Sequence, residues 1–214
     1  MWAAVCTRPD LSYAVGQLSQ YASNPDKSHF RALNQCIRYL RGTADYRLTY
    51  RGEGRAEDVP ALTGYSDADW AGDIGTRRST TGYVFQLCGG AVSWQSKRQR
   101  TTAQSTVEAE YMAAASAAKE AIWLRALLTG IGCKPSGPTI LRVDNEGAIK
   151  LADNPRHHEL TKHIAVRYHL IREHIADNTI VLVHVPTELQ VADGLTKGLT
   201  REKHTASVRL LGMA

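Results

Sequence analysis

Apolar residues in the first fifty positions recur at the three- and four-residue spacing of helices. The first series comprises Leu11, Val15, Leu18 and Tyr21, and the second comprises Phe30, Leu33, Ile37 and Leu40. Asn24 and Pro25 separate the two series and Gly42 follows the second, as residues that end helices do. We expect a small helical unit over residues 1–50 and a charged linker with glycine and proline over residues 51–60.

From residue 61 onward, short β-rich runs alternate with amphipathic helical segments. The predicted strands are Leu62–Ser66, Thr81–Leu87, Ala91–Ser96, Thr139–Val143 and Ile180–Val185. The predicted helices are Thr106–Thr129, Gly147–Ala152, Thr161–Ala176 and a short one near Leu189. This order predicts an α/β domain over residues 61–200, with a mixed five-stranded sheet flanked by helices. Residues 201–214 are expected to form a C-terminal tail.

Composition narrows the class of protein. Hydrophobic residues make up 43% of the 214 positions and charged residues 22%, which excludes a wholly disordered chain. No apolar run approaches the roughly 18 residues of a membrane span, and no signal-peptide pattern opens the chain. We therefore expect neither a membrane partner nor secretion. The four cysteines form no CxxC pair, which excludes a zinc ribbon, and the net charge of +5 weakly favours a polyanionic partner.

Four acidic residues stand out by position. Asp67 and Asp144 each follow a predicted strand, where sites gather in open sheets, and Asp193 lies in the helix after the last strand. Each of these could equally be a helix-capping or loop carboxylate. Glu110 falls on the small apolar face of its helix, where a carboxylate is costly without a partner. That face comprises Val107, Ala114, Ala117, Ala121 and Leu128. A divalent cation shared with the aspartates would supply the partner, and an ion pair with a distant arginine is the alternative.

Six segments, in this order, resemble the ribonuclease H domain of copia-type retrotransposon Pol polyproteins. They are GYSDADWAGD (64–73), RRSTTGYVF (77–85), STVEAEYMA (105–113), VDNEGAIKLADNP (143–155), TKHIAVRYHLIRE (161–173) and VPTELQVADGLTK (185–197). Upstream, TRPDLSYAV (7–15) and RYLRGT (38–43) resemble the end of the reverse transcriptase of that polyprotein. The resemblance implies a ribonuclease H-like fold and identifies residues 1–50 as a remnant of the reverse transcriptase.

The resemblance also implies an active site. Asp67, Glu110, Asp144 and Asp193 match the catalytic, metal-binding carboxylates of the family, with Asp69 as the alternative for the first position. The implied cofactor is a pair of Mg²⁺ ions, with Mn²⁺ as an alternative, because hard cations prefer oxygen ligands. Cellular ribonucleases H carry a histidine in the loop after the last strand. Here that loop has none, and His184 lies within the preceding strand.

The implied function is hydrolysis of the RNA strand of RNA–DNA hybrids during reverse transcription. The expected partners are the hybrid and the rest of the Pol polyprotein, including reverse transcriptase and integrase, in a cytoplasmic virus-like particle or the nucleus. No YVDD-like motif occurs, so we expect no DNA polymerisation. A basic stretch is expected to hold phosphates, although a solvated hairpin face would look the same. It consists of Arg77, Arg78, Lys97, Arg98 and Arg100. Two alternatives stay open: a non-catalytic nucleic-acid-binding remnant, and another nuclease on the same sheet, as in integrases and resolvases.

Overall fold

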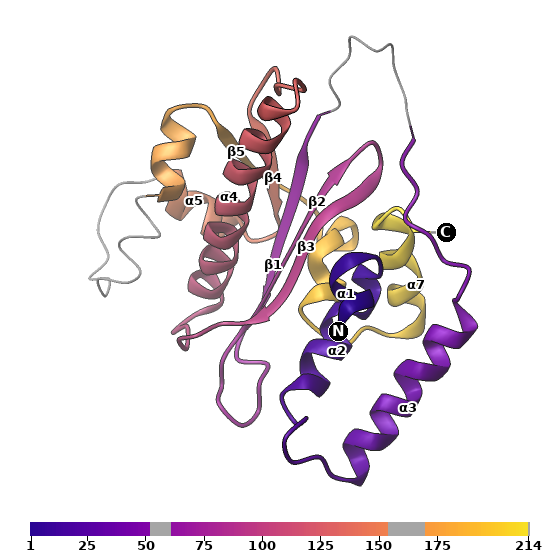
Figure 1. Ribbon diagram of the computed structural model, residues 1–214. Helices are drawn as coiled ribbons and strands as arrows, with labels where there is room; N and C mark the ends of the chain where they lie inside the picture. The colour runs from indigo at the N-terminus through magenta and orange to yellow at the C-terminus, as the bar shows by residue number, and fades with distance from the viewer. Residues whose placement is uncertain (52–60, 154–169, 214) are drawn as a thin grey trace.

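The computed structural model describes residues 1–51, 61–153 and 170–213. Its centre is a five-stranded sheet with strand order β3-β2-β1-β4-β5 (Figure 1). The strands are β1 (Thr63–Asp69), β2 (Thr80–Leu87), β3 (Gly90–Arg98), β4 (Thr139–Val143) and β5 (Ile180–His184). Strands β1, β2 and β3 pair antiparallel, whereas β4 runs parallel to β1 and β5 parallel to β4. This mixed sheet confirms the expected ribonuclease H-like α/β fold.

Strand β1 is longer than its apolar pattern predicts. Its pairing with β2 continues to Asp69, which lies opposite Thr80. The expected end at Ser66 is therefore wrong, and Asp67 lies inside the strand rather than after it. The polar run from Ser66 to Asp69 ends the hydrophobic pattern, but backbone hydrogen bonds to β2 do not depend on side-chain polarity.

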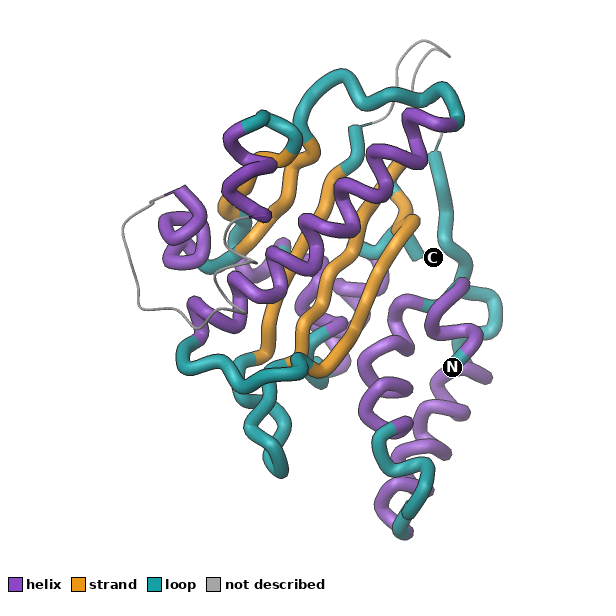
Figure 2. Tube along the Cα trace, turned by 60° about the vertical axis from the view of Figure 1, so that its left-hand side comes forward, coloured by secondary structure: helices purple, strands orange, loops and turns teal. Residues whose placement is uncertain are grey.

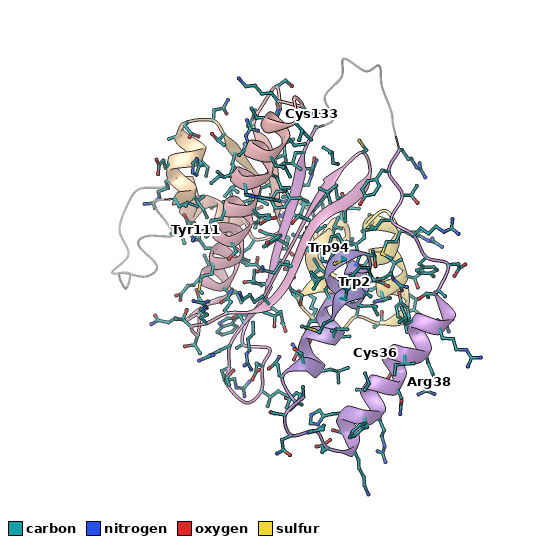
Figure 3. All side chains as sticks on the ribbon, in the orientation of Figure 1. Trp2, Cys36, Arg38, Trp94, Tyr111 and Cys133 are labelled. Atoms are coloured by element: carbon teal, nitrogen blue, oxygen red, sulfur yellow. The ribbon has the colours of Figure 1, made fainter. Side chains whose placement is uncertain are left out.

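One face of the sheet is covered by helix α4 (Thr106–Gly130), which crosses the strands in Figure 2. The side chain of Ser105 caps this helix by accepting a hydrogen bond from the backbone N–H of Glu108 (3.1 Å). Alanines along α4 permit close packing on the sheet, and Tyr111 is almost fully buried (Figure 3). Helix α5 (Glu146–Asp153) and helical residues 170–176 complete this layer. The rest of the helix expected over Thr161–Ala176 lies outside the described residues.

The opposite face carries the two ends of the chain (Figure 1). Two 3₁₀ helices, η2 (Thr187–Leu189) and η3 (Val191–Leu195), replace the single short helix expected near Leu189. Helix α7 (Arg201–Leu210) follows. Its Val208, together with Leu211 and Met213, is buried in the core of this face, so residues 201–213 pack on the domain although the sequence suggests a tail. The C-terminal end also meets residues before the expected linker, since Thr49 N donates to Gly212 O (2.9 Å).

The N-terminal helices are α1 (Trp2–Cys6), α2 (Ser12–Ser19) and α3 (Lys27–Gly42), with a 3₁₀ turn η1 (Pro9–Leu11) between the first two. The unit contacts the sheet through Trp94, whose indole N–H donates to Ala4 O (2.8 Å; Figure 3). Within the first upstream motif, Arg8 and Asp10 form a buried ion pair (2.7 Å) that hydrogen bonds then connect to the second motif. The Arg8 guanidinium also donates to the hydroxyl (2.7 Å) and the carbonyl oxygen (2.9 Å) of Thr43, and Tyr39 donates its hydroxyl proton to Asp10 (2.7 Å).

Most of residues 51–60, expected as a linker, lie outside the described residues; Arg51 is described and its N–H donates to Cys88 O (2.8 Å). All four cysteines are free thiols. Among the described residues, no helix combines the length and the apolar character that crossing a membrane requires.

Candidate active site

Three carboxylates from distant parts of the chain meet at one end of the sheet. Oxygen atoms of Asp67, Glu110 and Asp144 lie within 4.8 Å of one another. Parallel pairing explains the two aspartates, because Ser66 of β1 lies beside Val143 of β4 and each is followed by an aspartate. Glu110 arrives from the second turn of α4, where its Oε1 accepts a hydrogen bond from Ala68 N (3.2 Å).

The cluster is buried and electrostatically unfavourable without a cation. Asp67 is 3% exposed and Glu110 7%. Burial, followed by the charges of Asp67 and Asp144, raises the pKa of Glu110 to about 10. Burial also raises the pKa of Asp67 to about 6, with Asp144 adding to the effect, and burial raises the pKa of Asp144. Three carboxyl groups this close cannot all be ionised without strong electrostatic repulsion.

The donor set fits a hard divalent cation. The Oε2 atom of Glu110 is buried and has no hydrogen-bond partner among the described residues. Within the same part of the chain, no salt bridge reaches Glu110, so the alternative of an arginine partner finds no support there. All the ligand atoms are carboxylate oxygens, which Mg²⁺ and Mn²⁺ accept and which zinc sites rarely use alone.

Asp193 lies near this group but outside it. Its carboxylate forms an ion pair with Lys197, four residues later in the chain. Its negative charge nevertheless contributes to the raised pKa values of Asp67 and Asp144. Burial alone would lower the pKa of Lys197, but its hydrogen bond to Asp193 and the charge of Asp67 raise it overall. The site therefore contains the ammonium group of Lys197, a residue that the sequence analysis did not identify.

Thr196 is a second residue that sequence reasoning missed. Its buried hydroxyl donates a hydrogen bond to Asp67 Oδ2. Gly82 makes this contact possible: it lies directly opposite Asp67 in β2, and a Cβ there would come within 2.6 Å of the Thr196 methyl carbon. Gln190 holds the preceding segment in place by donating to Ser66 O (2.9 Å) and accepting from Ala192 N (3.2 Å). The only sequence signal is a glycine within a β-rich run, which marks close approach of another segment.

Asp69, the alternative for the first position, lies two residues beyond Asp67 and hence on the same face of β1. It is half-buried and does not belong to the three-carboxylate group. His184 is exposed at the end of β5, where it pairs with Val143, so it lies at the active-site end of the sheet.

The basic residues separate into two places. Arg77 is exposed in the loop between β1 and β2, with a left-handed backbone (φ 53°). The other four line a groove at the end of β3: Arg78, Lys97, Arg98 and Arg100. Arg98 is not free of acids, because its guanidinium pairs with Asp73 (2.6 Å) and holds the pKa of that carboxyl at about 2.

No protein-family model matches the chain. It is 45% identical over 213 residues to the retrovirus-related Pol polyprotein from transposon TNT 1-94 of Nicotiana tabacum, a match covering 100% of this chain and 16% of the polyprotein. It is 42% identical over 207 residues to that from transposon RE2 of Arabidopsis thaliana, covering 97% of this chain and 14% of the polyprotein. It is 55% identical over 124 residues to the secreted RxLR effector protein 161 of Plasmopara viticola, covering 58% of this chain and 84% of that protein.

Among solved structures, the foamy viral protease-reverse transcriptase bound to double-stranded DNA is similar with a TM-score of 0.50 and 14% identity. That similarity covers 87% of this chain and 30% of the viral one. A ribonuclease H1 isolated from compost by a metagenomic approach is similar with a TM-score of 0.47 and 20% identity, over 64% of this chain and 92% of that enzyme.

The sheet order and the carboxylate cluster place the chain in the ribonuclease H-like class of folds. Its relatives are more specific. Over nearly its whole length the chain is similar to retrovirus-related Pol polyproteins from transposons, and it spans 16% and 14% of the length of the two plant polyproteins.

Proposed function

We propose that this chain is the ribonuclease H domain of a copia-type Pol polyprotein and hydrolyses the RNA strand of RNA–DNA hybrids. The observation that carries the proposal is the buried group of three carboxylates, in which Glu110 lacks a partner on one oxygen among the described residues. A purely structural role does not account for three acids that destabilise one another.

Asp67, Glu110 and Asp144 would hold divalent cations, with Asp193 at the edge of the group. When bound, two such ions supply stabilisation of the attacking and the leaving oxygen in phosphodiester hydrolysis. Mg²⁺ is the expected ion, and Mn²⁺ is the alternative. The chain itself contributes orientation: Thr196 fixes the Asp67 carboxylate and Ala68 N fixes that of Glu110.

Substrate binding would depend on backbone shape. Hybrids are recognised through phosphates and 2′-hydroxyls rather than base sequence. Arg77, Arg78, Lys97, Arg98 and Arg100 are the proposed phosphate contacts. In the parent polyprotein, residues 1–50 would continue the reverse transcriptase, residues 51–60 would link it to the ribonuclease H domain, and integrase would be a further partner. The proposed setting is a cytoplasmic virus-like particle or the nucleus, without secretion.

A cleavage assay tests this function. Hybrid with labelled RNA is incubated with the wild type in Mg²⁺, in Mn²⁺ and in EDTA, with single-stranded RNA as the substrate control. We expect metal-dependent cleavage of the hybrid alone. Glu110→Gln should abolish most of it, whereas the matched variant Glu108→Gln, two positions away on the same helix, should retain it. Hybrid binding by the wild type without any cleavage would instead support the non-catalytic remnant.

A further inference from the structure

Helix α2 lies beside the end of the sheet that carries the carboxylates. It contacts both β3 and η3, and a Cβ placed on Gly16 would lie 3.9 Å from Ser96 O. Tyr13, at the start of this helix, is partly buried, and its pKa is raised by burial and by the nearby charge of Asp69. The N-terminal unit therefore reaches the active-site face, although the sequence separates it from the sheet by the expected linker.

A groove of about 360 Å³ runs between α2 and the end of β3. Tyr13, Gln17 and Gln20 line it on the α2 side, and three arginines line it on the sheet side: Arg78, Arg98 and Arg100. The residues that line it include no Asp or Glu among those the structure describes. Arg98 gives one of its five N–H donors to Asp73 (2.6 Å) and keeps others for a ligand.

The sheet side of the groove lies two strands from β1, the strand that carries Asp67 and Asp69. Asp69, Thr80 and Arg98 occupy matching positions on three neighbouring strands. At about 4.8 Å between strands, the Arg98 backbone lies about 10 Å from that of Asp69. Guanidinium groups, side-chain amides and a phenol hydroxyl are the donors that proteins direct at phosphate and sugar oxygens.

We infer that α2 is one wall of the substrate channel, and that Tyr13, Gln17 and Gln20 contact the phosphodiester backbone of the hybrid beside the cut. This inference rests on the proposed function and extends it: the N-terminal unit takes part in substrate binding and is not merely a remnant. The partner is a nucleic-acid backbone, and its negative charge makes the contact testable by charge substitution.

The test compares two double variants of opposite charge. Gln17→Glu with Gln20→Glu adds two negative charges to the groove and should raise the Kd for a labelled RNA–DNA hybrid about tenfold at low salt. Gln17→Lys with Gln20→Lys should lower the Kd, and should steepen the slope of log K against log salt by about one to two. Binding is measured by fluorescence anisotropy in EDTA, where cleavage does not interfere.

The matched controls place the same charges on α3, away from the groove, at Asn34 and Gln35. Their Kd values should equal that of the wild type. The inference is overturned if the groove variants behave like these controls, or if both charge signs weaken binding equally, since the latter would report a damaged fold. If the wild type neither binds nor cuts the hybrid, the proposed function is overturned together with this inference. If the wild type does both but the groove variants behave like the controls, only the role of α2 is overturned.

Discussion

Replacing Glu110 by glutamine should stabilise the metal-free protein at neutral pH. The substitution keeps the size of the side chain and an acceptor for Ala68 N (3.2 Å in the wild type), but it removes the ionisable proton. In the wild type the pKa of Glu110 rises from 4.5 to about 10, because the group is buried beside Asp67 and Asp144. The unfolded chain thus releases this proton above pH 4.5, whereas the folded protein retains it.

The sign and the size of the change in stability between the wild type and Glu110→Gln follow from proton linkage. A carboxyl whose pKa is raised on folding contributes its stability fully below pH 4.5 and loses it as the pH rises toward about 10. At about 1.4 kcal/mol per pH unit, the free energy of unfolding of the wild type falls by at most about 3 kcal/mol between pH 4.5 and pH 7 through this group. Glu110→Gln has no ionisable group at this position and does not show that loss. The two proteins should therefore be equally stable near pH 4.5, and their free energies of unfolding should differ increasingly above it.

Urea unfolding in EDTA, followed by tryptophan fluorescence at pH 5, 7 and 9, measures the difference. Glu108→Gln is the control and should follow the pH dependence of the wild type. Added Mg²⁺ should then stabilise the wild type and have little effect on Glu110→Gln, because a ligand that binds only the folded state stabilises it by mass action. The reasoning fails if Glu110→Gln is less stable than the wild type at pH 7 in EDTA, or if both show the same pH dependence.

Three further predictions concern residues around the site and the N-terminal unit. Gly82→Ala should push Thr196 away from Asp67 and cost about 1–3 kcal/mol of stability together with most hybrid cleavage, measured by urea unfolding and the cleavage assay; retained activity would contradict it. Lys197→Met should increase the affinity of the metal-free protein for Mn²⁺ several-fold in calorimetric titration, since it leaves Asp193 uncompensated, and unchanged affinity would show that the ammonium does not oppose the metal. Asp10→Ala should destabilise the protein by about 3–5 kcal/mol by leaving a buried guanidinium unpaired, and a loss below 1 kcal/mol in urea unfolding would rule this out.

Much of the sheet and the position of Glu110 follow from local sequence patterns. The burial of Glu110 is readable from a helical wheel because a helix repeats every 3.6 residues wherever it packs. Asp144 directly follows β4, as expected, because the apolar run Thr139–Val143 coincides with the strand. Local periodicity carries this information without any knowledge of the partner segments.

Local sequence patterns do not predict the long-range contacts that complete the site. Thr196 and Asp67 are 129 residues apart, and nothing near either residue indicates the other. The pairing of Asp193 with Lys197 is local, but whether a lysine four residues away points to the aspartate or to solvent depends on the fold around it. The packing of α7 was missed for the same reason, since Val208 and Met213 find their partners on β2 and η3 rather than nearby in the chain.

Elements on both faces of the sheet contribute residues to the carboxylate cluster. This explains how the fold maintains a cluster that is electrostatically unfavourable. Glu110 belongs to the α4 side, whereas Thr196 and Asp193 belong to the side of η3 and α7. Each layer has its own apolar core, and together these cores hold the acids at one end of the sheet against their mutual repulsion. A change in either layer should therefore alter the spacing of the carboxylates, and with it metal affinity, even where it touches no ligand. Helix α2 packs against η3, so the N-terminal unit is coupled to the site by the same contacts that would place it beside the substrate.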